Sequence, residues 1–227
     1  MKNTILNWSG GKDYAIALYR LLQEKKYRPV KFITTINRAK SRVPMHEVHE
    51  SLIAKQAKSC GFDLKRLYLP ARASNKVYEE IMERFWNKEK EAGNTVAAFG
   101  DIFLEDVKEY REKHLRPMGI ETIFPLWKSD THMLIKEFLN LGFKAIITAA
   151  DARFFGEDIP GKELNENFVS NLPDGVDPCG ENGEFHTFVY DGPVFNSCVE
   201  YKKGVKGFTA FDKKGSGAWH LGLLPVD

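Results

Sequence analysis

Residues 9–13, Ser9-Gly10-Gly11-Lys12-Asp13, combine residue types that together can bind a phosphate group. They follow an apolar run at residues 5–8 and precede a helical pattern that starts at Tyr14. Glycine lets the backbone turn sharply, and the first N–H groups of a helix point at an anion with the help of the helix dipole. Lys12 adds a positive charge and Ser9 a hydroxyl donor. The pattern predicts a phosphate-binding loop between a strand and a helix.

Two common nucleotide-binding patterns, G-x-x-x-x-G-K-[ST] and G-x-G-x-x-G, do not occur in the sequence. A dinucleotide site therefore has no support. An ordinary glycine-containing turn between a strand and a helix remains the alternative interpretation of residues 9–13.

A second group of reactive side chains lies in the stretch PDGVDPCGENGEFHTF at residues 173–188. Long loops in compact domains are usually functional or disordered, and the aromatic residues and the strand pattern that follow favour order. Glu181, Glu184 and His186 are its candidate functional residues. The alternative is that they stabilise and cap the loop itself.

Acidic residues also follow a predicted strand at residues 95–99. Asp101 is a candidate Mg²⁺ ligand, because this ion takes one or two carboxylates together with phosphate oxygens. Glu105 and Asp106 are explained equally well by the dipole of the helix that they begin. The sequence His46-Glu47-Val48-His49 is not H-E-x-x-H, so we expect substrate contact or solvation there, on a helix predicted over 46–61, rather than a metal.

The hydrophobic pattern alternates between strands and helices up to residue 127. Strands are predicted at 4–8, 30–36, 64–69, 95–99 and 122–126, and helices at 13–26, 46–61, 76–91 and 104–114. This order is typical of an α/β Rossmann-like parallel sheet with helices on both faces. The carboxyl ends of its strands would bring Ser9–Asp13, Thr34 and Gly100-Asp101 to one ligand-binding edge.

The pattern changes after Trp127, so we predict a nucleotide-binding domain over 1–127 and a smaller α+β substrate-binding domain over 128–227. The second part has a predicted helix at 129–141, capped by Ser129 or Asp130, a strand at 144–150 and a helix at 161–172. Short strands joined by turns are predicted at 199–201, 208–211 and 219–224.

Composition limits the class of protein. The chain has 227 residues, 43% hydrophobic and 28% charged, with a net charge of +2, which is ordinary for a globular protein and makes nucleic acid an unexpected partner. It has no apolar run of membrane-spanning length, and we expect neither a signal peptide nor a membrane partner. Cys60, Cys179 and Cys198 are dispersed and fit a cytoplasmic protein, with Cys179 an incidental thiol rather than a nucleophile.

The loop at 9–13 resembles the SGGKDS loop of the ATP pyrophosphatase (PP-loop, adenine nucleotide alpha hydrolase-like) superfamily, with Tyr14 in place of the final Ser. The whole chain resembles the diphthine–ammonia ligase family within it. The segments that carry this resemblance are Trp8–Asp13, Met45-His46 with Gln56-Ala57, Gly100–Ile102 with Glu105-Asp106, and Gly180–Phe188 followed by Asp191–Pro193.

The resemblance implies an ATP-dependent amide ligase that uses Mg²⁺. A substrate carboxylate would be adenylated with release of pyrophosphate, and ammonia would then displace AMP. Ser9, Gly10, Gly11, Lys12, Asp13 and Tyr14 would bind the nucleotide together with Thr34, Gly100 and Asp101. Lys12, Asp13, Glu181, Glu184 and His186 would be catalytic, the last three facing the second substrate. A homodimer is a further expectation.

Three alternatives stay open at this point. The residues 181–187 resemble the short prokaryotic members of the family, for which amidation of another metabolite, such as a corrinoid, is an alternative. Tyr14 departs from the loop pattern and favours a module that binds ATP or AMP without chemistry. RNA thiolation also occurs in the superfamily, but near-neutral charge and scattered cysteines count against it.

Overall fold

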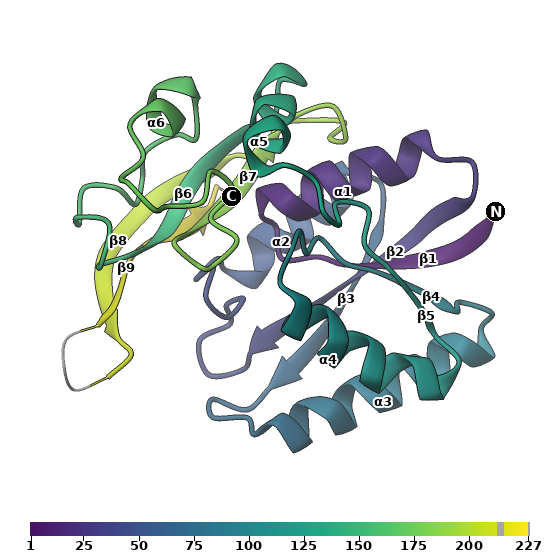
Figure 1. The fold of residues 1–227 in the computed structure, drawn as a ribbon. Coiled ribbons are helices and arrows are strands. Elements are labelled where there is room, and N and C mark those ends of the chain that lie inside the picture. The colour runs from purple at the N-terminus through teal and green to yellow at the C-terminus, as the bar shows by residue number, and fades with distance from the viewer. Residues whose placement is uncertain (213–215, 227) are drawn as a thin grey trace.

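The computed structural model describes residues 1–212 and 216–226 and contains two sheets (Figure 1). The first is the expected parallel sheet, with the order β3-β2-β1-β4-β5. Its strands are β1 (Lys2–Asn7), β2 (Tyr27–Asn37), β3 (Asp63–Leu69), β4 (Val96–Ala98) and β5 (Glu121–Ile123). Every neighbouring pair is parallel, so the carboxyl ends lie at one edge of the sheet.

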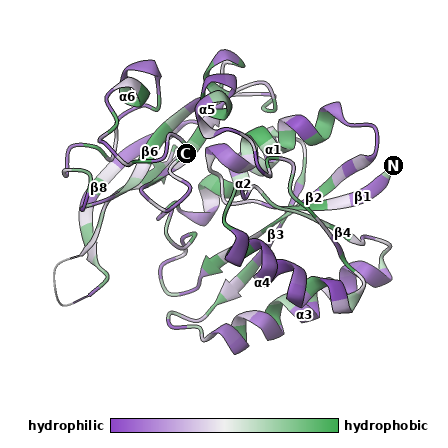
Figure 2. Cartoon of the chain, in the orientation of Figure 1, coloured by the Kyte–Doolittle hydropathy of each residue, from purple (hydrophilic) through white to green (hydrophobic). Residues whose placement is uncertain are grey.

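Helices cover both faces of this sheet, as predicted. They are α1 (Lys12–Gln23), α2 (Glu50–Ser59), α3 (Asn75–Glu91) and α4 (Glu105–Leu115), which a short 3₁₀ helix η1 (Arg116–Met118) follows. Side chains alternate along β1, so Leu6 packs in one core with Ile16 of α1, whereas Ile5 packs in another with Trp86 of α3. Helix α4 is mostly hydrophilic in Figure 2, as an outer helix should be.

The prediction of a helix from His46 was wrong. Helix α2 begins at Glu50, and His49 caps it by accepting a hydrogen bond at Nδ1 from the Ser51 backbone N–H at 3.2 Å. Met45 and Glu47 have positive φ angles of 66° and 52°, which an α-helix does not accommodate. The two histidines at 46 and 49 therefore do not share a helix face.

The second part of the chain forms the expected smaller α+β unit. Its antiparallel sheet has the order β7-β6-β9-β8. The elements are α5 (Thr131–Asn140), β6 (Lys144–Asp151), α6 (Glu166–Ser170), β7 (Phe185–Asp191), β8 (Tyr201–Ala210) and β9 (Gly217–Pro225). Asp130 caps α5 by accepting from the Met133 N–H at 2.9 Å.

Two predicted elements of this unit differ from the structure. The helix predicted at 161–172 is reduced to α6, because the preceding residues run beside β6: the Ile147 N–H donates to the Lys162 carbonyl at 2.9 Å, and the Leu164 N–H to the Ala145 carbonyl at 2.9 Å. The short strands predicted at 199–201 and 208–211 overlap the two ends of one long strand, β8, which begins at Tyr201 and ends at Ala210.

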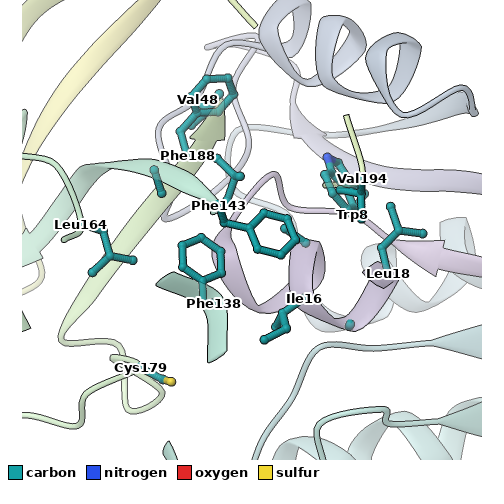
Figure 3. Close-up of a cluster of buried hydrophobic side chains, with 14 of the residues drawn as sticks. Trp8, Ile16, Leu18, Val48, Phe138, Phe143, Leu164, Cys179, Phe188 and Val194 are labelled. Carbon is teal, nitrogen blue, oxygen red and sulfur yellow. The ribbon is translucent and has the colours of Figure 1, made fainter. Parts of the chain in front are cut away.

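A continuous apolar core joins the two sheets. Phe138 of α5 stacks on Phe143 with ring centroids 4.8 Å apart, and both belong to the core that contains Ile16 and Leu18 of α1 (Figure 3). Helix α1 thus contacts both units, and the division near residue 128 stays a prediction. Within the described part of the chain, no helix is long and apolar enough to cross a bilayer.

Candidate active site

The predicted phosphate loop lies where β1 ends and α1 begins. Gly10 has φ +85°, and a Cβ there would lie 2.6 Å from the Gln56 side-chain oxygen and 2.6 Å from Ile53 Cδ1, so the position requires glycine on two grounds. Gly11 is the N-cap residue of α1. The N–H groups of Asp13 and Tyr14 lie in the first helical turn and have no intrahelical carbonyl to bind, so they can donate to an anion.

A buried glutamine fixes this loop from behind. Gln56 is fully buried on α2, and its amide group donates to the carbonyl of Gly10 at 3.0 Å and to that of Val189 at 2.6 Å. Its side-chain oxygen accepts from Trp8 Nε1 at 2.9 Å. The Val189 N–H also donates to the Gly10 carbonyl at 3.0 Å. Gln56 therefore joins β1, the loop and β7, a role that its sequence position did not predict.

Strand β7 completes the start of α1. The Lys12 N–H donates to the Thr187 hydroxyl at 3.0 Å, although the two residues are far apart in sequence. Sequence reasoning missed Thr187, because a threonine in a strand is usually a packing residue.

Lys12 is a buried cation next to an acid. Its side chain is 4% exposed, and Nζ lies 3.0 Å from Asp13 Oδ2 and 5.2 Å from the centroid of the Phe185 ring. Burial by itself lowers the pKa of Lys12, but the negative charge of Asp13 outweighs this effect and the pKa is raised. Lys12 thus stays positively charged where a phosphate would lie.

Glu181 and Glu184 have different hydrogen-bond partners and therefore different roles in the acidic loop. Glu181 accepts from the Ile102 N–H at 2.7 Å, which attaches the loop to the end of β4, and burial raises its pKa to about 7. Glu184 is 3% exposed and holds the loop together, because Oε1 accepts from the Asp177 N–H at 3.1 Å and from Asn182 Nδ2 at 2.9 Å. Its Oε2 is buried and has no hydrogen-bond partner within residues 1–212 and 216–226.

Two uncharged histidines meet between the sheets. The rings of His46 and His186 are 4.7 Å apart at their centroids. His46 Nδ1 lies 3.3 Å from the Thr187 carbonyl oxygen, which can only accept, so Nδ1 carries the proton. Burial lowers the pKa of His46 to about 4 and that of His186 well below its ordinary value.

Asp101 is paired with an arginine that the sequence did not single out. Both of its oxygens accept from Arg111, at 2.7 Å from Nε and 2.9 Å from Nη2. Tyr14 lies in the same group, because Arg111 and Asp101 both affect its pKa, which burial raises. The backbone of Gly100 packs on the first turn of α1, since a Cβ there would lie 3.1 Å from the Asp13 carbonyl carbon. A Mg²⁺-binding role for Asp101 stays a prediction.

These groups surround a cavity of about 460 Å³, hereafter the loop cavity. Ser9, Lys12, Asp13, Tyr14, Gly100, Asp101, Glu181 and His186 line it. Strand β2 contributes Thr35 to the wall, whereas the predicted Thr34 is 3% exposed, because neighbouring strand residues point to opposite faces. In the described part of the chain, no three His, Cys, Asp or Glu residues gather as a metal site requires.

Cys179 lies close to this cavity but is not an activated nucleophile. Its thiol is buried and donates to the Thr131 carbonyl at 3.4 Å. Burial raises its pKa despite the nearby positive charge of Lys12. Since the thiolate is the reactive form, this cysteine is inert at neutral pH.

The chain matches two domain families over most of its length. The diphthamide synthase N-terminal domain matches residues 1–122, and the diphthamide synthase C-terminal domain matches residues 130–220. The chain belongs to the diphthamide synthase family. The resemblance found in the sequence is thereby confirmed.

Curated relatives carry the name diphthine–ammonia ligase. The protein of Mus musculus is 30% identical over 129 residues, which are 53% of this chain and 46% of that protein. The Homo sapiens protein is 27% identical over 126 residues, with the same shares of 53% and 46%. The Schizosaccharomyces pombe protein is 28% identical over 92 residues, which are 39% of this chain and 15% of that protein. The matched part of this diphthamide synthase family member thus spans less than half the length of these relatives.

Two solved structures of archaeal proteins are also similar to the chain. One is a predicted subunit of tRNA methyltransferase from Methanocaldococcus jannaschii, with a TM-score of 0.44 and 16% identity over 63% of this chain and 77% of that one. The other is the U34-tRNA thiolase NcsA from Methanococcus maripaludis, with a TM-score of 0.36 and 18% identity over 62% of this chain and 58% of that one. At these values, neither likeness bears on function.

Proposed function

We propose that this diphthamide synthase family member is an ATP-dependent ligase that activates a substrate carboxylate and transfers ammonia to it. One observation carries the proposal. The start of α1, with its buried Lys12, and the acidic loop around Glu181 are far apart in the sequence and line the same cavity of about 460 Å³. An anion site and a proton-accepting group beside one cavity are what such a reaction requires.

In the first step, the protein would bind and polarise the phosphates. Lys12 and the N–H groups of the first turn of α1 hold the β and γ phosphates and stabilise the charge that builds up on the departing pyrophosphate. The substrate carboxylate attacks the α phosphorus, a new O–P bond forms, and the bond to pyrophosphate breaks. The products are an acyl adenylate and pyrophosphate.

In the second step, ammonia attacks the acyl carbon and AMP leaves with the electron pair of the C–O bond. The attacking nitrogen must lose a proton. Glu181, with a pKa of about 7, is the candidate acceptor on the cavity wall, whereas the neutral His186, whose pKa burial holds well below its ordinary value, is a weak base that can accept a hydrogen bond from the ammonia. Glu181 lines the loop cavity, so in this proposal it takes the proton directly from the attacking nitrogen.

Mg²⁺ would need the phosphate oxygens of the nucleotide as well as this wall, because the described residues hold no three-ligand metal site of their own. Asp13, Asp101 and Glu181 line the cavity beside the expected phosphates, and carboxylate oxygens with phosphate oxygens are the ligands that this ion prefers. When bound, the ion would neutralise phosphate charge. Asp101 would join it only if Arg111 released one of its oxygens.

The cellular compartment, the oligomeric state and the substrate also belong to the proposal. Free thiols at Cys60, Cys179 and Cys198, all in the described residues, fit a reducing cytoplasm. A homodimer and the identity of the carboxylate, whether on a protein side chain or on a small molecule, stay predictions.

The test is the binding and fate of the nucleotide. ATP·Mg²⁺ is titrated into the wild type, into Lys12→Ala and into Lys25→Ala, a control that removes an exposed lysine just beyond α1, and the recovered nucleotide is identified by chromatography. We expect Lys12→Ala to bind at least about tenfold more weakly, or about 1.4 kcal/mol, and Lys25→Ala to match the wild type.

Each outcome decides something. Equal binding by all three proteins, or no binding, would refute the role of the loop. Release of AMP and pyrophosphate in the presence of ammonia and carboxylic acids supports the ligase. Recovery of intact ATP under every condition would leave the alternative, a nucleotide-binding module with Tyr14 in a disabled loop.

A further inference from the structure

A second cavity adjoins the loop cavity on the side of the antiparallel sheet. It has a volume of about 270 Å³, and we call it the sheet chamber. Four residues line both cavities, namely Met45, Asn182, Gly183 and His186. Within the described part of the chain, these four residues form a wall that the sheet chamber shares with the loop cavity.

Strand register explains the floor of the sheet chamber. Ala149 of β6 pairs with His186 of β7 on one side and with His220 of β9 on the other, so the three side chains project from one face of the sheet. Ala218 of β9 and Thr209 of β8 pair with each other and continue this face. Because the side chains at its centre are small, they leave open space above the floor between the two imidazole rings.

The imidazole of His220 lies flat on this floor. A Cβ at Gly207 would lie 2.5 Å from His220 Cε1, so the ring occupies the space above the glycine. Burial lowers the pKa of His220, and that of His186 is lowered in the same way, so both rings present neutral aromatic surface.

The carboxylates that line the sheet chamber are each paired with a cation. Asp151 accepts from Arg153 Nη2 at 2.6 Å, and Glu47 accepts from Lys40 Nζ at 2.9 Å. Among the described residues that line the chamber, each carboxylate thus has its cation. The mouth carries apolar side chains instead, since Met45 is 64% exposed and Phe211 is 63% exposed. A charged occupant would find no unpaired counterion among these described wall residues.

We propose that the sheet chamber binds the uncharged, planar or apolar body of a small carboxylic acid, whose carboxyl group reaches past His186 into the loop cavity. The volume of about 270 Å³ is just below the usual range of ligand pockets, so the part of the acid that the chamber encloses is small. The inference rests on the proposed ligase function and adds the substrate class.

The test uses simple acids as probes. Phenylacetate and 3-phenylpropionate carry a flat neutral ring, and glutarate and adipate carry a second carboxylate instead. Binding is measured by saturation-transfer NMR with the intact chain and α,β-methylene-ATP, which does not release pyrophosphate. We expect the ring acids to bind at millimolar concentration and the dicarboxylates at least about tenfold more weakly.

Two variants test whether the acids bind in the sheet chamber. Ala149→Phe fills the floor, and Thr209→Trp fills it from the exposed strand β8, where a large residue is tolerated during folding. Each should weaken the ring acids by at least about tenfold, with nucleotide affinity within about twofold of the wild type. Ala210→Trp is the matched control, because the next residue of β8 points to the other face, and it should leave acid binding unchanged.

The inference fails if no ring acid binds, if the dicarboxylates bind equally well, or if both filling variants bind the ring acids like the wild type. Failure of the proposed function is a separate result, because the wild type would then not bind α,β-methylene-ATP. Acid binding, and its loss in Ala149→Phe, are therefore also measured without nucleotide.

Discussion

Replacing Gln56 by methionine tests whether the amide holds the phosphate loop in place. The side chain is fully buried, and methionine has a similar volume, so the change removes hydrogen bonds without leaving a large cavity. Trp8 Nε1 loses its acceptor at 2.9 Å and the Val189 carbonyl loses a donor at 2.6 Å. The Gly10 carbonyl keeps the Val189 N–H.

The expected loss of stability follows from the two groups left without these bonds. A buried polar group deprived of its partner costs about 1–3 kcal/mol, so Gln56→Met should lower the free energy of unfolding by about 2–6 kcal/mol. Because Gly10 then has one constraint fewer, ATP should also bind more weakly, by about tenfold or more.

Urea unfolding followed by fluorescence and circular dichroism measures the first effect, and ATP titration measures the second. Gln23→Met, at the exposed end of α1, is the control and should change stability by less than about 0.5 kcal/mol. A loss below about 1 kcal/mol for Gln56→Met, with unchanged ATP affinity, would refute the idea that the amide positions the loop.

Three further predictions concern the same region. Gly10→Ala should lower the unfolding free energy by about 2 kcal/mol more than Gly93→Ala in urea titrations, since both have positive φ but only Gly10 is crowded; equal losses would contradict the crowding argument. The pKa of Glu181 is raised from 4.5 to about 7, so the folded protein holds a proton that the unfolded chain releases, and stability should fall as pH rises through this interval. Between pH 4.5 and pH 8, the free energy of unfolding of the wild type should fall by at most about 3 kcal/mol more than that of Glu181→Gln, as measured by unfolding curves at the two pH values. The same pH dependence in both proteins would contradict a raised pKa of Glu181. Iodoacetamide at neutral pH should label the exposed Cys198 first and Cys179 only after unfolding, as read by peptide mass spectrometry; early labelling of Cys179 would show that its thiol is not buried.

Much of the first sheet could be predicted from the sequence because its signals are local. Apolar runs of strand length alternate with helical periodicity, and such alternation permits few topologies other than a parallel sheet with helices on both faces. The loop at Ser9–Asp13 was predictable for the same reason, since glycine, lysine and a helix start are adjacent in the chain. Asp130 was likewise one of two predicted caps for α5.

Local signals failed where tertiary contacts replaced them. Residues 46–49 have helical composition, yet Arg42 forms bridges with Asn37 and His49 that hold this stretch in a turn. Residues 161–165 pair with β6 instead of extending α6, because the backbone of a strand edge offers hydrogen bonds that periodicity does not reveal. Thr35 rather than Thr34 lines the loop cavity. Which of two neighbouring strand residues faces a ligand depends on how both faces of the sheet are packed, and the sequence of one strand does not show this.

The sequence by itself determined the family, the parallel sheet and the residue types that would bind phosphate, because these depend on short stretches of chain. Only the tertiary structure decided that Gln56, Thr187 and Glu181 meet residues 8–12 and 102, since contacts between segments so far apart in sequence form only when the whole chain packs. The sheet chamber is also a tertiary feature. Its floor exists because the register of β6 to β9 sets small residues from three strands on one face, between His186 and His220.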